Sequence, residues 1–401
     1  MLAILANRTY RHLFMAQVIA LIGTGLATVA LGLLAYDMAG DRAGAVLGTA
    51  LAIKMSAYIL IAPFATALAE RFPRRSMLVA LDLVRALAAL ALPFVSQVWE
   101  IYILIFVLQS ASAAFTPTFQ ATIPDILPQE RDYTRALSLS RLAYDLESVI
   151  SPVLAAALLT MMSFHNLFAG TALGFMASAA LVVSSSLPKA RSAVAPRSFY
   201  DKATSGIRIF LATPRLRGLL ALNMAVAAAS SMVIVNTVVL VQAGFGLPQS
   251  STAAALALFG LGSMLAAILL PRLLDSMSDR LPMLAGTLLL VVGLVAGIFI
   301  HNYRMLLALW LLLGVGYSLA QTPVGRLLKR SSSAEDRPAL FAAQFALSHS
   351  CWLLTYPLAG WVGAAFSVKA AFALMATIAA VSLAAAIAIW PQEHKTQEAN
   401  Q

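Results

Sequence analysis

The chain has 401 residues, of which 61% are hydrophobic and only 11% are charged, and its mean hydropathy is +0.85. Soluble domains average about 45–50% apolar and about 25% charged residues, so this composition excludes an ordinary water-soluble enzyme, a disordered protein and a nucleic-acid-binding protein. The net charge of +10 fits basic residues that flank membrane spans, and the single cysteine, Cys351, excludes a disulfide framework within the chain.

Apolar runs long enough to cross a bilayer recur along the whole chain. A membrane-spanning helix needs about 20 mostly apolar residues, and Ala and Leu, which favour helices, dominate these runs. The sequence therefore predicts an all-α polytopic membrane protein with twelve transmembrane helices. The predicted spans are approximately 12–36, 45–69, 76–95, 100–123, 138–160, 165–187, 216–241, 251–274, 281–300, 304–324, 339–362 and 368–390.

Lys and Arg residues fall mainly on one side of the predicted bundle. If the N-terminus is cytoplasmic, the inner segments and the span ends next to them hold 22 of the 27 Lys and Arg residues, and the outer segments and span ends hold only Arg42, Arg304 and Lys369. The positive-inside rule sets orientation by this bias. It predicts an even number of spans and both termini in the cytoplasm, in the inner membrane of a bacterium.

A long polar segment near the middle of the chain leaves six predicted spans on each side. Short motifs recur in order across this division at an offset of about 206 residues, as Thr116-Pro117 and Thr322-Pro323 do, and parallel repeats are typical of transporters with a site between their halves. The amphipathic stretch SFYDKATSGIRIFL predicts a helix on the inner leaflet. The predicted parts are an N-terminal six-helix bundle (1–187), a cytoplasmic central loop (188–215), a C-terminal six-helix bundle (216–390) and a cytoplasmic tail (391–401).

The segment after the second predicted span, TALAERFPRRSML, resembles the loop between the second and third helices of the major facilitator superfamily, G-x-L-x-D-R-x-G-R-R. Thr66 and Pro73 replace the two glycines of that pattern. The loop is a conformational latch on the cytoplasmic side in that family, so the resemblance implies a latch here. Its residues, with those of the degenerate second-half counterpart, are Leu68, Glu70, Arg71, Arg74, Arg75, Asp275 and Arg280.

A second element of the family lies in the fifth predicted span. The run SPVLAA, which starts at Ser151, resembles the G-P-x-x-G-G element of antiporters, with small residues in place of glycine. Over its length the chain looks like the exporter branch that includes macrolide-efflux-type drug:proton antiporters, and residues 115–152 also look similar to nickel-resistance permeases. The resemblance implies two bundles with pseudo-two-fold symmetry, alternating access, and export driven by protons.

Six charged side chains lie within the predicted spans, where ionisable residues are costly and usually face the interior of a bundle. The spacing of Asp82 and Arg85 is i,i+3, and that of Arg141 and Asp145 is i,i+4, so each couple can pair along one helix face. Either couple is a packing pair or takes a direct part in transport. The six are Lys54, Asp82, Arg85, Arg141, Asp145 and Glu147.

Glu147 differs from the other charged residues, because it points about 200° away from Asp145 around the helix and has no basic residue at i+3 or i+4. A desolvated carboxylate can load and release a proton, so Glu147 is the predicted proton-coupling residue. The alternative is a salt bridge from Glu147 to Lys54 or Arg85 of another helix. A bridge that breaks and re-forms during transport would satisfy both interpretations.

His349 lies in the middle of the eleventh predicted span. Histidine can relay protons or bind metal, and the alternative is a neutral side chain hydrogen-bonded within the bundle. Cys351 is only two residues away and therefore lies on another face of the helix. The sequence accordingly predicts no metal site, and His349 is a second candidate for proton coupling.

Several polar residues within the spans could line a cavity, although such residues more often bridge helices. No P-loop and no hydrolase motif occurs, so neither an enzyme nor a bound cofactor is expected. The cavity candidates are Gln17, Gln109, Asn223, Tyr317 and Gln344.

The favoured prediction is a monomeric secondary transporter that exports a small drug-like or amphipathic compound in exchange for protons, in contact with membrane lipids. One alternative is efflux of a divalent metal such as nickel. Another is a membrane receptor or lipid-handling protein without ion coupling, which would have no need for Glu147.

Overall fold

The computed structural model describes residues 2–69, 73–185, 187, 199–274, 278–331 and 337–390. These residues fold almost entirely into helices, as the apolar, Ala- and Leu-rich runs predict. The elements are η1 (Leu2–Ala6), α1 (Arg8–Ala39), η2 (Gly40–Arg42), α2 (Ala43–Ala69), α3 (Arg74–Ala91), η3 (Leu92–Phe94), α4 (Val98–Ile126), α5 (Glu130–Leu158), α6 (His165–Val183), α7 (Phe199–Ala212), α8 (Pro214–Val238), η4 (Val239–Gly244), α9 (Gln249–Leu274), α10 (Arg280–Gly297), α11 (Tyr303–Gln321), α12 (Val324–Arg330), α13 (Arg337–Ala365) and α14 (Val368–Ile389).

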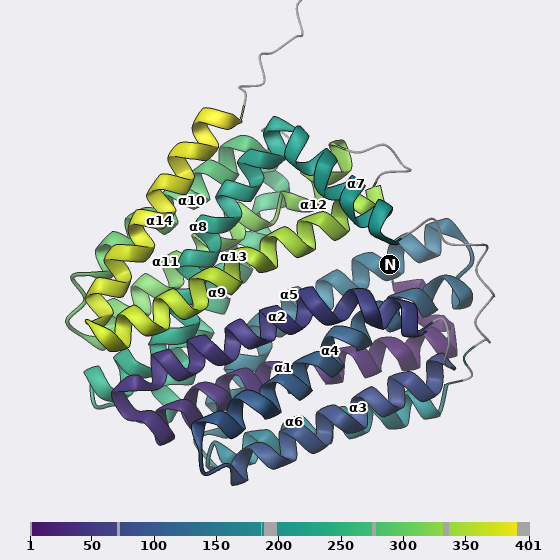
Figure 1. Cartoon of the computed structure of the whole chain (residues 1–401), viewed down its shortest axis with the longest axis horizontal. Helices are drawn as coiled ribbons and strands as arrows, with labels where there is room; N and C mark the ends of the chain where they lie inside the picture. Colours follow the sequence, from purple (N-terminus) through teal and green to yellow (C-terminus); the bar gives the residue numbers. More distant parts are fainter. Residues whose placement is uncertain are drawn as a thin grey trace, which may run out of the picture.

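The helices gather into two groups that follow the halves of the chain (Figure 1). In the first half, α1 packs against α5 and α6, α2 against α4, and α3 against α4 and α6. In the second half, α8 packs against α13 and α14, α9 against α11, and α10 against α11 and α14. The halves meet where α2 lies against α13 and where α5 lies against α9. The predicted all-α fold of two six-helix bundles is therefore confirmed.

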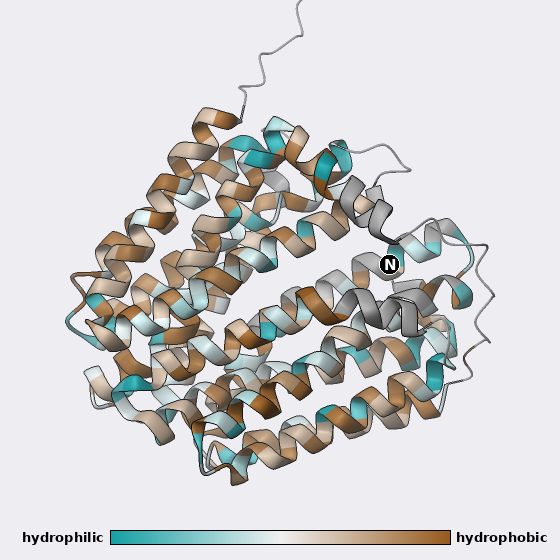
Figure 2. Cartoon of the chain, viewed as in Figure 1, coloured by the Kyte–Doolittle hydropathy of each residue, from teal (hydrophilic) through white to brown (hydrophobic). Residues whose placement is uncertain are grey.

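Each predicted span coincides with a helix of the structure. Among the described residues, nine helical stretches are long and apolar enough to cross a membrane, and the first, Arg8–Ile61, contains the first predicted span and most of the second. The chain turns between these two at Gly40, whose φ of 52° lies in the left-handed region that favours glycine. Helices α5 and α13 occupy the fifth and eleventh predicted spans. Hydrophilic residues gather mainly near helix ends (Figure 2).

Large apolar side chains cover the outside of the bundle. Leu83, Leu87 and Leu90 form a stripe along α3 and are 47%, 67% and 40% exposed. Soluble monomers rarely expose contiguous apolar surfaces of this kind, whereas lipid-facing helices require them. The surface of the molecule thus agrees with a membrane protein.

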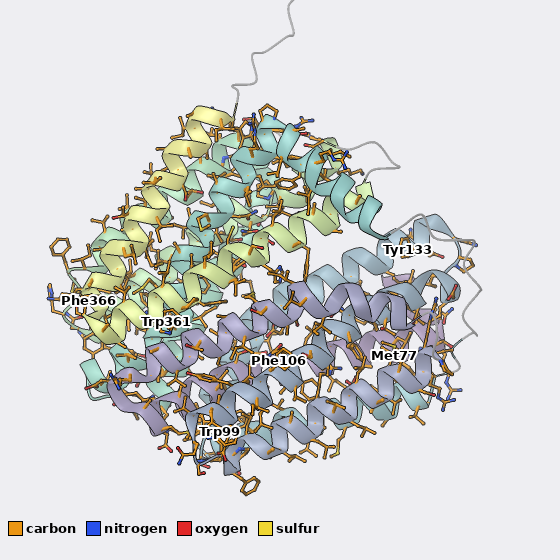
Figure 3. All side chains as sticks on the ribbon, in the orientation of Figure 1. Met77, Trp99, Phe106, Tyr133, Trp361 and Phe366 are labelled. Atoms are coloured by element: carbon orange, nitrogen blue, oxygen red, sulfur yellow. The ribbon has the colours of Figure 1, made fainter. Side chains whose placement is uncertain are left out.

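The bundle has two distinct sides. We call the side with η1 and the start of α3 the termini side, and the side with η2 and η3 the distal side. Figure 3 shows Met77 and Tyr133 toward the termini side, and Trp99 and Phe366 at the distal side. Helix α2 runs from the distal to the termini side, and α13 runs in the opposite direction.

The halves touch closely at the distal side, along a seam between the start of α2 and the end of α13. A Cβ atom at Gly48 would lie 2.5 Å from the carbonyl oxygen of Tyr356, and one at Gly360 would lie 2.0 Å from that of Gly44. The indole Nε1 of Trp361 also donates to Oγ1 of Thr49 at 2.9 Å. Toward the termini side the ribbons of α2 and α13 diverge (Figure 1).

Helix α7 belongs to the predicted central loop, but it packs onto the second half. It contacts α13 and α8, and its Phe210 is fully buried in a cluster with Leu216 and Leu340. The prediction of a helix in this segment is confirmed. At least one large apolar side chain of this helix meets protein rather than the membrane surface.

Candidate functional site between the two halves

Three titratable side chains from three helices come together between the halves. Lys54 of α2 interacts electrostatically with Glu147 of α5 and with His349 of α13. All three side chains are half-buried. Lys54 follows the start of α2 by 11 residues, and Glu147 precedes the end of α5 by 11 residues, which places both about 16 Å from the distal helix ends. The cluster thus lies near mid-height and contains groups of both halves.

The carboxylate of Glu147 lies against α1 at Gly25, where α1 has no side chain. A Cβ atom at Gly25 would lie 2.5 Å from Oε1 of Glu147 and 2.2 Å from Oγ of Ser151. Ser151 in turn donates to the carbonyl oxygen of Ile22 at 3.5 Å. A glycine in α1 therefore makes room for the charged face of α5. Of the two bases considered for Glu147, the structure brings Lys54 to it.

His349 lies at the centre of a group of rings. Its centroid is 3.9 Å from that of Phe345, 5.7 Å from that of Tyr58 and 6.1 Å from that of Trp352. Its Nδ1 lies 2.7 Å from the carbonyl oxygen of Phe345, and because a carbonyl only accepts, Nδ1 carries the proton. In the neutral ring Nε2 is then an acceptor.

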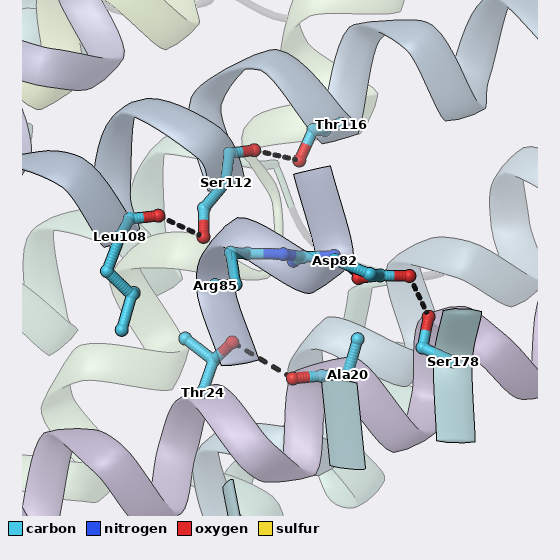
Figure 4. Close-up of polar contacts among 8 residues, drawn as sticks. All are labelled: Ala20, Thr24, Asp82, Arg85, Leu108, Ser112, Thr116 and Ser178. Carbon is cyan, nitrogen blue, oxygen red and sulfur yellow. Dashed lines mark hydrogen bonds and ion pairs between the residues drawn. The ribbon is translucent and has the colours of Figure 1, made fainter. Parts of the chain in front are cut away.

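Asp82 and Arg85 form a separate network inside the first half (Figure 4). The two side chains are 0% and 4% exposed and form an ion pair, as their i,i+3 spacing predicts. Ser178 of α6 donates to Oδ2 of Asp82 at 2.8 Å. The guanidinium carbon of Arg85 lies 4.1 Å and 4.5 Å from the ring centroids of Phe115 and Phe175. The pair thus joins α3, α4 and α6. The side chains of the other predicted couple, Arg141 and Asp145, lie outside the described residues.

The predicted latch is only partly described, since Leu68, Glu70, Arg71 and Asp275 lie outside the described side chains. Arg74 forms an ion pair with Asp125 at the end of α4. Arg75 donates to the carbonyl oxygen of Val183, and Arg280 donates to that of Ile387 at 3.5 Å.

Sequence reasoning missed the second-half counterpart of the Arg74 pair. Asp279 precedes α10, is 2% exposed, and forms ion pairs with Arg326 and, at 3.0 Å, with Arg330 of α12. The offset of the repeat was the available signal, because Arg74 and Asp279 are 205 positions apart. In the first half the base, Arg74, lies at the start of α3, whereas at the corresponding place in the second half, before α10, lies the acid, Asp279.

The cavity candidates have different surroundings. Gln17 accepts from Ser140 at 2.9 Å, which joins α1 to α5, and Asn223 accepts from Gln321 at 3.0 Å, which joins α8 to α11. Within the described part of the chain, the buried Oε1 atoms of Gln109 and Gln344 have no hydrogen-bond partner.

The last cavity candidate, Tyr317, packs edge-on against Phe259, with ring centroids 5.6 Å apart.

The sequence reasoning missed the rings around His349. Tyr58 follows Lys54 by four residues, Phe345 precedes His349 by four, and Trp352 follows His349 by three. At spacings of three or four residues, each ring lies on the same helix face as the charged or polar residue from which it is counted. Among the residues described, no group of three or more His, Cys, Asp or Glu side chains is placed to hold a metal ion.

Known proteins resemble this chain in sequence and in fold. Uncharacterized MFS-type transporter YfiS of Bacillus subtilis (strain 168) is 23% identical over 294 residues, which cover 71% of this chain and 70% of that protein. Macrolide efflux protein A of Enterococcus faecalis is 26% identical over 153 residues, which cover 36% of this chain and 47% of that protein.

Two solved structures share the fold at low identity. A bacterial homolog to the human lysosomal transporter Spinster, in an inward-facing and unoccupied conformation, has a TM-score of 0.76 at 12% identity, over 95% of this chain and 96% of that chain. The nucleoside transporter NupG has a TM-score of 0.70 at 11% identity, over 96% of this chain and 100% of that chain. The family model described as Major Facilitator Superfamily matches residues 13–234 and again residues 219–401. The chain therefore belongs to the Major Facilitator Superfamily.

Proposed function

We propose that this membrane transporter exports small drug-like or amphipathic compounds in exchange for protons, with Glu147 as the proton carrier. The observation that carries the proposal is the electrostatic interaction of Lys54 with Glu147 of its own half and with His349 of the other half. Because Lys54 interacts with groups of both halves, a change in the protonation of Glu147 can be linked to a movement of one half against the other.

The proposed coupling follows from the charges. Ionised Glu147 attracts Lys54 and balances its charge. Protonation of Glu147 removes this attraction and leaves the positive charge of Lys54 uncompensated, and an uncompensated charge away from water is strongly unfavourable. The arrangement that holds Lys54 beside Glu147 is then favoured only while the carboxylate is ionised. One proton that moves down a potential of 100 mV supplies about 2.3 kcal/mol for the cycle.

The sidedness of the proposal rests on the basic residues. We assign the termini side to the cytoplasm of a bacterial inner membrane, because the inner segments predicted from the sequence and the span ends next to them hold 22 of the 27 Lys and Arg residues. The close contacts of the distal seam then face outward. Export is supported by the likeness of 153 residues to macrolide efflux protein A. In the same proposal, the Asp82–Arg85 pair stabilises the first half and carries no proton.

Glu147→Gln tests the proposal, because glutamine keeps the shape of glutamate but cannot exchange a proton. We expect proteoliposomes that contain this variant to lose transport of ethidium or a macrolide driven by a pH gradient. Energy-independent exchange of the same compounds should persist. The matched control is Glu100→Gln, since Glu100 only accepts from Ser96 and Gln97 at the distal start of α4.

Three outcomes would contradict parts of this proposal. Full pH-driven transport by Glu147→Gln would exclude Glu147 as the proton carrier. Transport of Ni²⁺ but of no organic compound would replace the substrate class by a divalent metal. Saturable binding of a compound or lipid without any transport by the wild type would favour a receptor.

A further inference from the structure

We infer that the rings around His349 form the binding site for an uncharged, planar aromatic compound that carries an N–H or O–H donor. The rings are those of Tyr58, Phe345, His349 and Trp352. The inference rests on the proposed function, because it names the substrate class of that transporter.

The rings remain partly exposed at the place where the halves meet. The Tyr58 ring comes from α2 of the first half and lies 6.2 Å from Phe345 of α13, between centroids. Phe345 is 41% exposed, and the other three side chains are half-buried. An aromatic ligand placed here would stack on groups of both halves, as a substrate must when the halves move around it.

Part of the site is held rigid before any ligand arrives. The indole Nε1 of Trp352 donates to Oγ of Ser230 at 2.9 Å, and Ser230 is itself buried and donates to the carbonyl oxygen of Val226 at 2.7 Å. This chain of hydrogen bonds fixes the Trp352 ring against α8. A fixed ring loses little conformational entropy when a flat molecule binds to it.

The histidine supplies the polar requirement. Because Nδ1 of His349 already donates to the carbonyl oxygen of Phe345 at 2.7 Å, Nε2 is the position that remains for a ligand, and in the neutral ring it accepts. A ligand with an N–H or O–H group can satisfy it, whereas a ligand without a donor leaves the acceptor without a partner. The site thus distinguishes compounds that carry an N–H or O–H donor from compounds that lack one.

The neighbouring charges restrict the ligand to uncharged compounds. Lys54 interacts with His349, so a cation placed among the rings would be repelled. Glu147 interacts with the same lysine, so an anion would have to compete with this carboxylate for the positive charge of Lys54. A flat, neutral molecule is neither repelled by Lys54 nor in competition with Glu147.

A pair of naphthalene probes tests the inference with the purified full-length protein. Binding of 2-naphthol and of 2-methoxynaphthalene, which lacks the O–H donor, is measured by the shift of the thermal unfolding temperature. We expect the wild type to bind 2-naphthol about tenfold more tightly, because an unsatisfied acceptor disfavours the methylated probe. His349→Phe keeps a ring but removes the acceptor, so it should bind the two probes equally.

The control variants separate this inference from the proposed function. His165→Phe changes a histidine at the start of α6 and should keep the preference for 2-naphthol, as should Glu147→Gln, even though the latter loses pH-driven transport. If Glu147→Gln transports normally while His349→Phe loses the preference, the coupling proposal fails and the binding site stands.

Should His349→Phe fail to fold, His349→Gln provides the second test, since its amide oxygen should retain part of the preference. The inference is overturned if the wild type binds both probes equally or neither of them. It is also overturned if folded His349→Phe still prefers 2-naphthol.

Discussion

At the scale of single residues, the same kind of side chain has different surroundings in the two charged networks. Asp82 is fully buried and has an ion pair and a serine hydroxyl as partners, whereas Glu147 is half-buried and faces Lys54 across a helix interface. Spacing along the chain predicted the first arrangement, because both partners lie on one helix. It left the second open, because Lys54, Arg85 and Glu147 lie on three different helices, and only the folded bundle decides which base lies near Glu147.

A substitution at Gly25 should disturb Glu147 without touching its chemistry. The Cβ atom of Gly25→Ala would overlap with Glu147 and Ser151, and overpacking of this kind costs about 1–3 kcal/mol. We expect a lower unfolding temperature and loss of pH-driven transport, although alanine favours helices over glycine. Adding Ser151→Gly removes the overlap with Ser151 and should restore part of the unfolding temperature, whereas transport should stay impaired because the overlap with Oε1 of Glu147 remains.

Gly325 offers the matched control for Gly25, because a Cβ atom there would meet no atom within 4 Å. Gly325→Ala should leave the unfolding temperature and transport unchanged. An inactive Gly325→Ala, or an active and fully stable Gly25→Ala, would show that the glycine in α1 does not make room for Glu147.

Removal of one partner of the Asp82–Arg85 pair should destabilise the first half. Asp82→Asn removes the carboxylate that pairs with Arg85 beside two phenylalanine rings, and loss of one partner from a buried pair costs about 3–5 kcal/mol. We expect a sharp fall in folded protein, measured by size-exclusion chromatography of the detergent extract. The double variant Asp82→Leu with Arg85→Leu should recover folded protein and retain pH-driven transport. Loss of transport by the folded double variant would give the pair a direct role.

At the scale of elements, the contacts that join the halves differ from those that hold each half together. At the closest points of the seam between α2 and α13, the backbone of one helix meets a glycine of the other. On the termini side, the ion pairs of Arg74 and of Asp279 lie each within one half. Movement between the halves can thus open the seam and leave both pairs intact.

A large side chain in the seam should favour opening at the distal side. Gly360→Leu would place its side chain where the backbone of Gly44 now lies. We expect faster labelling of Thr49→Cys by a membrane-impermeant maleimide added outside, in a chain whose only native cysteine has been replaced by Cys351→Ser. The control is Gly170→Leu, since a Cβ atom at Gly170 has no neighbour closer than 3.9 Å. Equal labelling rates in the two variants would contradict the assignment of the seam as the outer closure.

At the scale of the whole molecule, composition and hydropathy predicted the fold because each span must satisfy its own backbone within the membrane. Span ends were less certain: α5 starts at Glu130, eight residues before the predicted start at 138. The packing of α7 onto the second half could not be predicted, because an amphipathic helix suits a protein surface and a membrane surface alike. The ring cluster was missed because only polar residues were considered as candidates, although aromatic residues also bind ligands.

The seam also limits how this chain can change over generations. Any single-nucleotide missense change at Gly48 or Gly360 adds at least a Cβ atom. That atom would lie 2.5 Å from a carbonyl oxygen at Gly48 and 2.0 Å from one at Gly360. Most such changes would weaken the closure, and a transporter that closes poorly leaks ions. The rings around His349 contact one another through their side chains, and a substitution there changes a side chain without adding an atom against the backbone of the other half. If the proposed binding site determines substrate preference, that preference can change under selection by new compounds, whereas the glycines of the seam cannot be replaced without loss of the close contact.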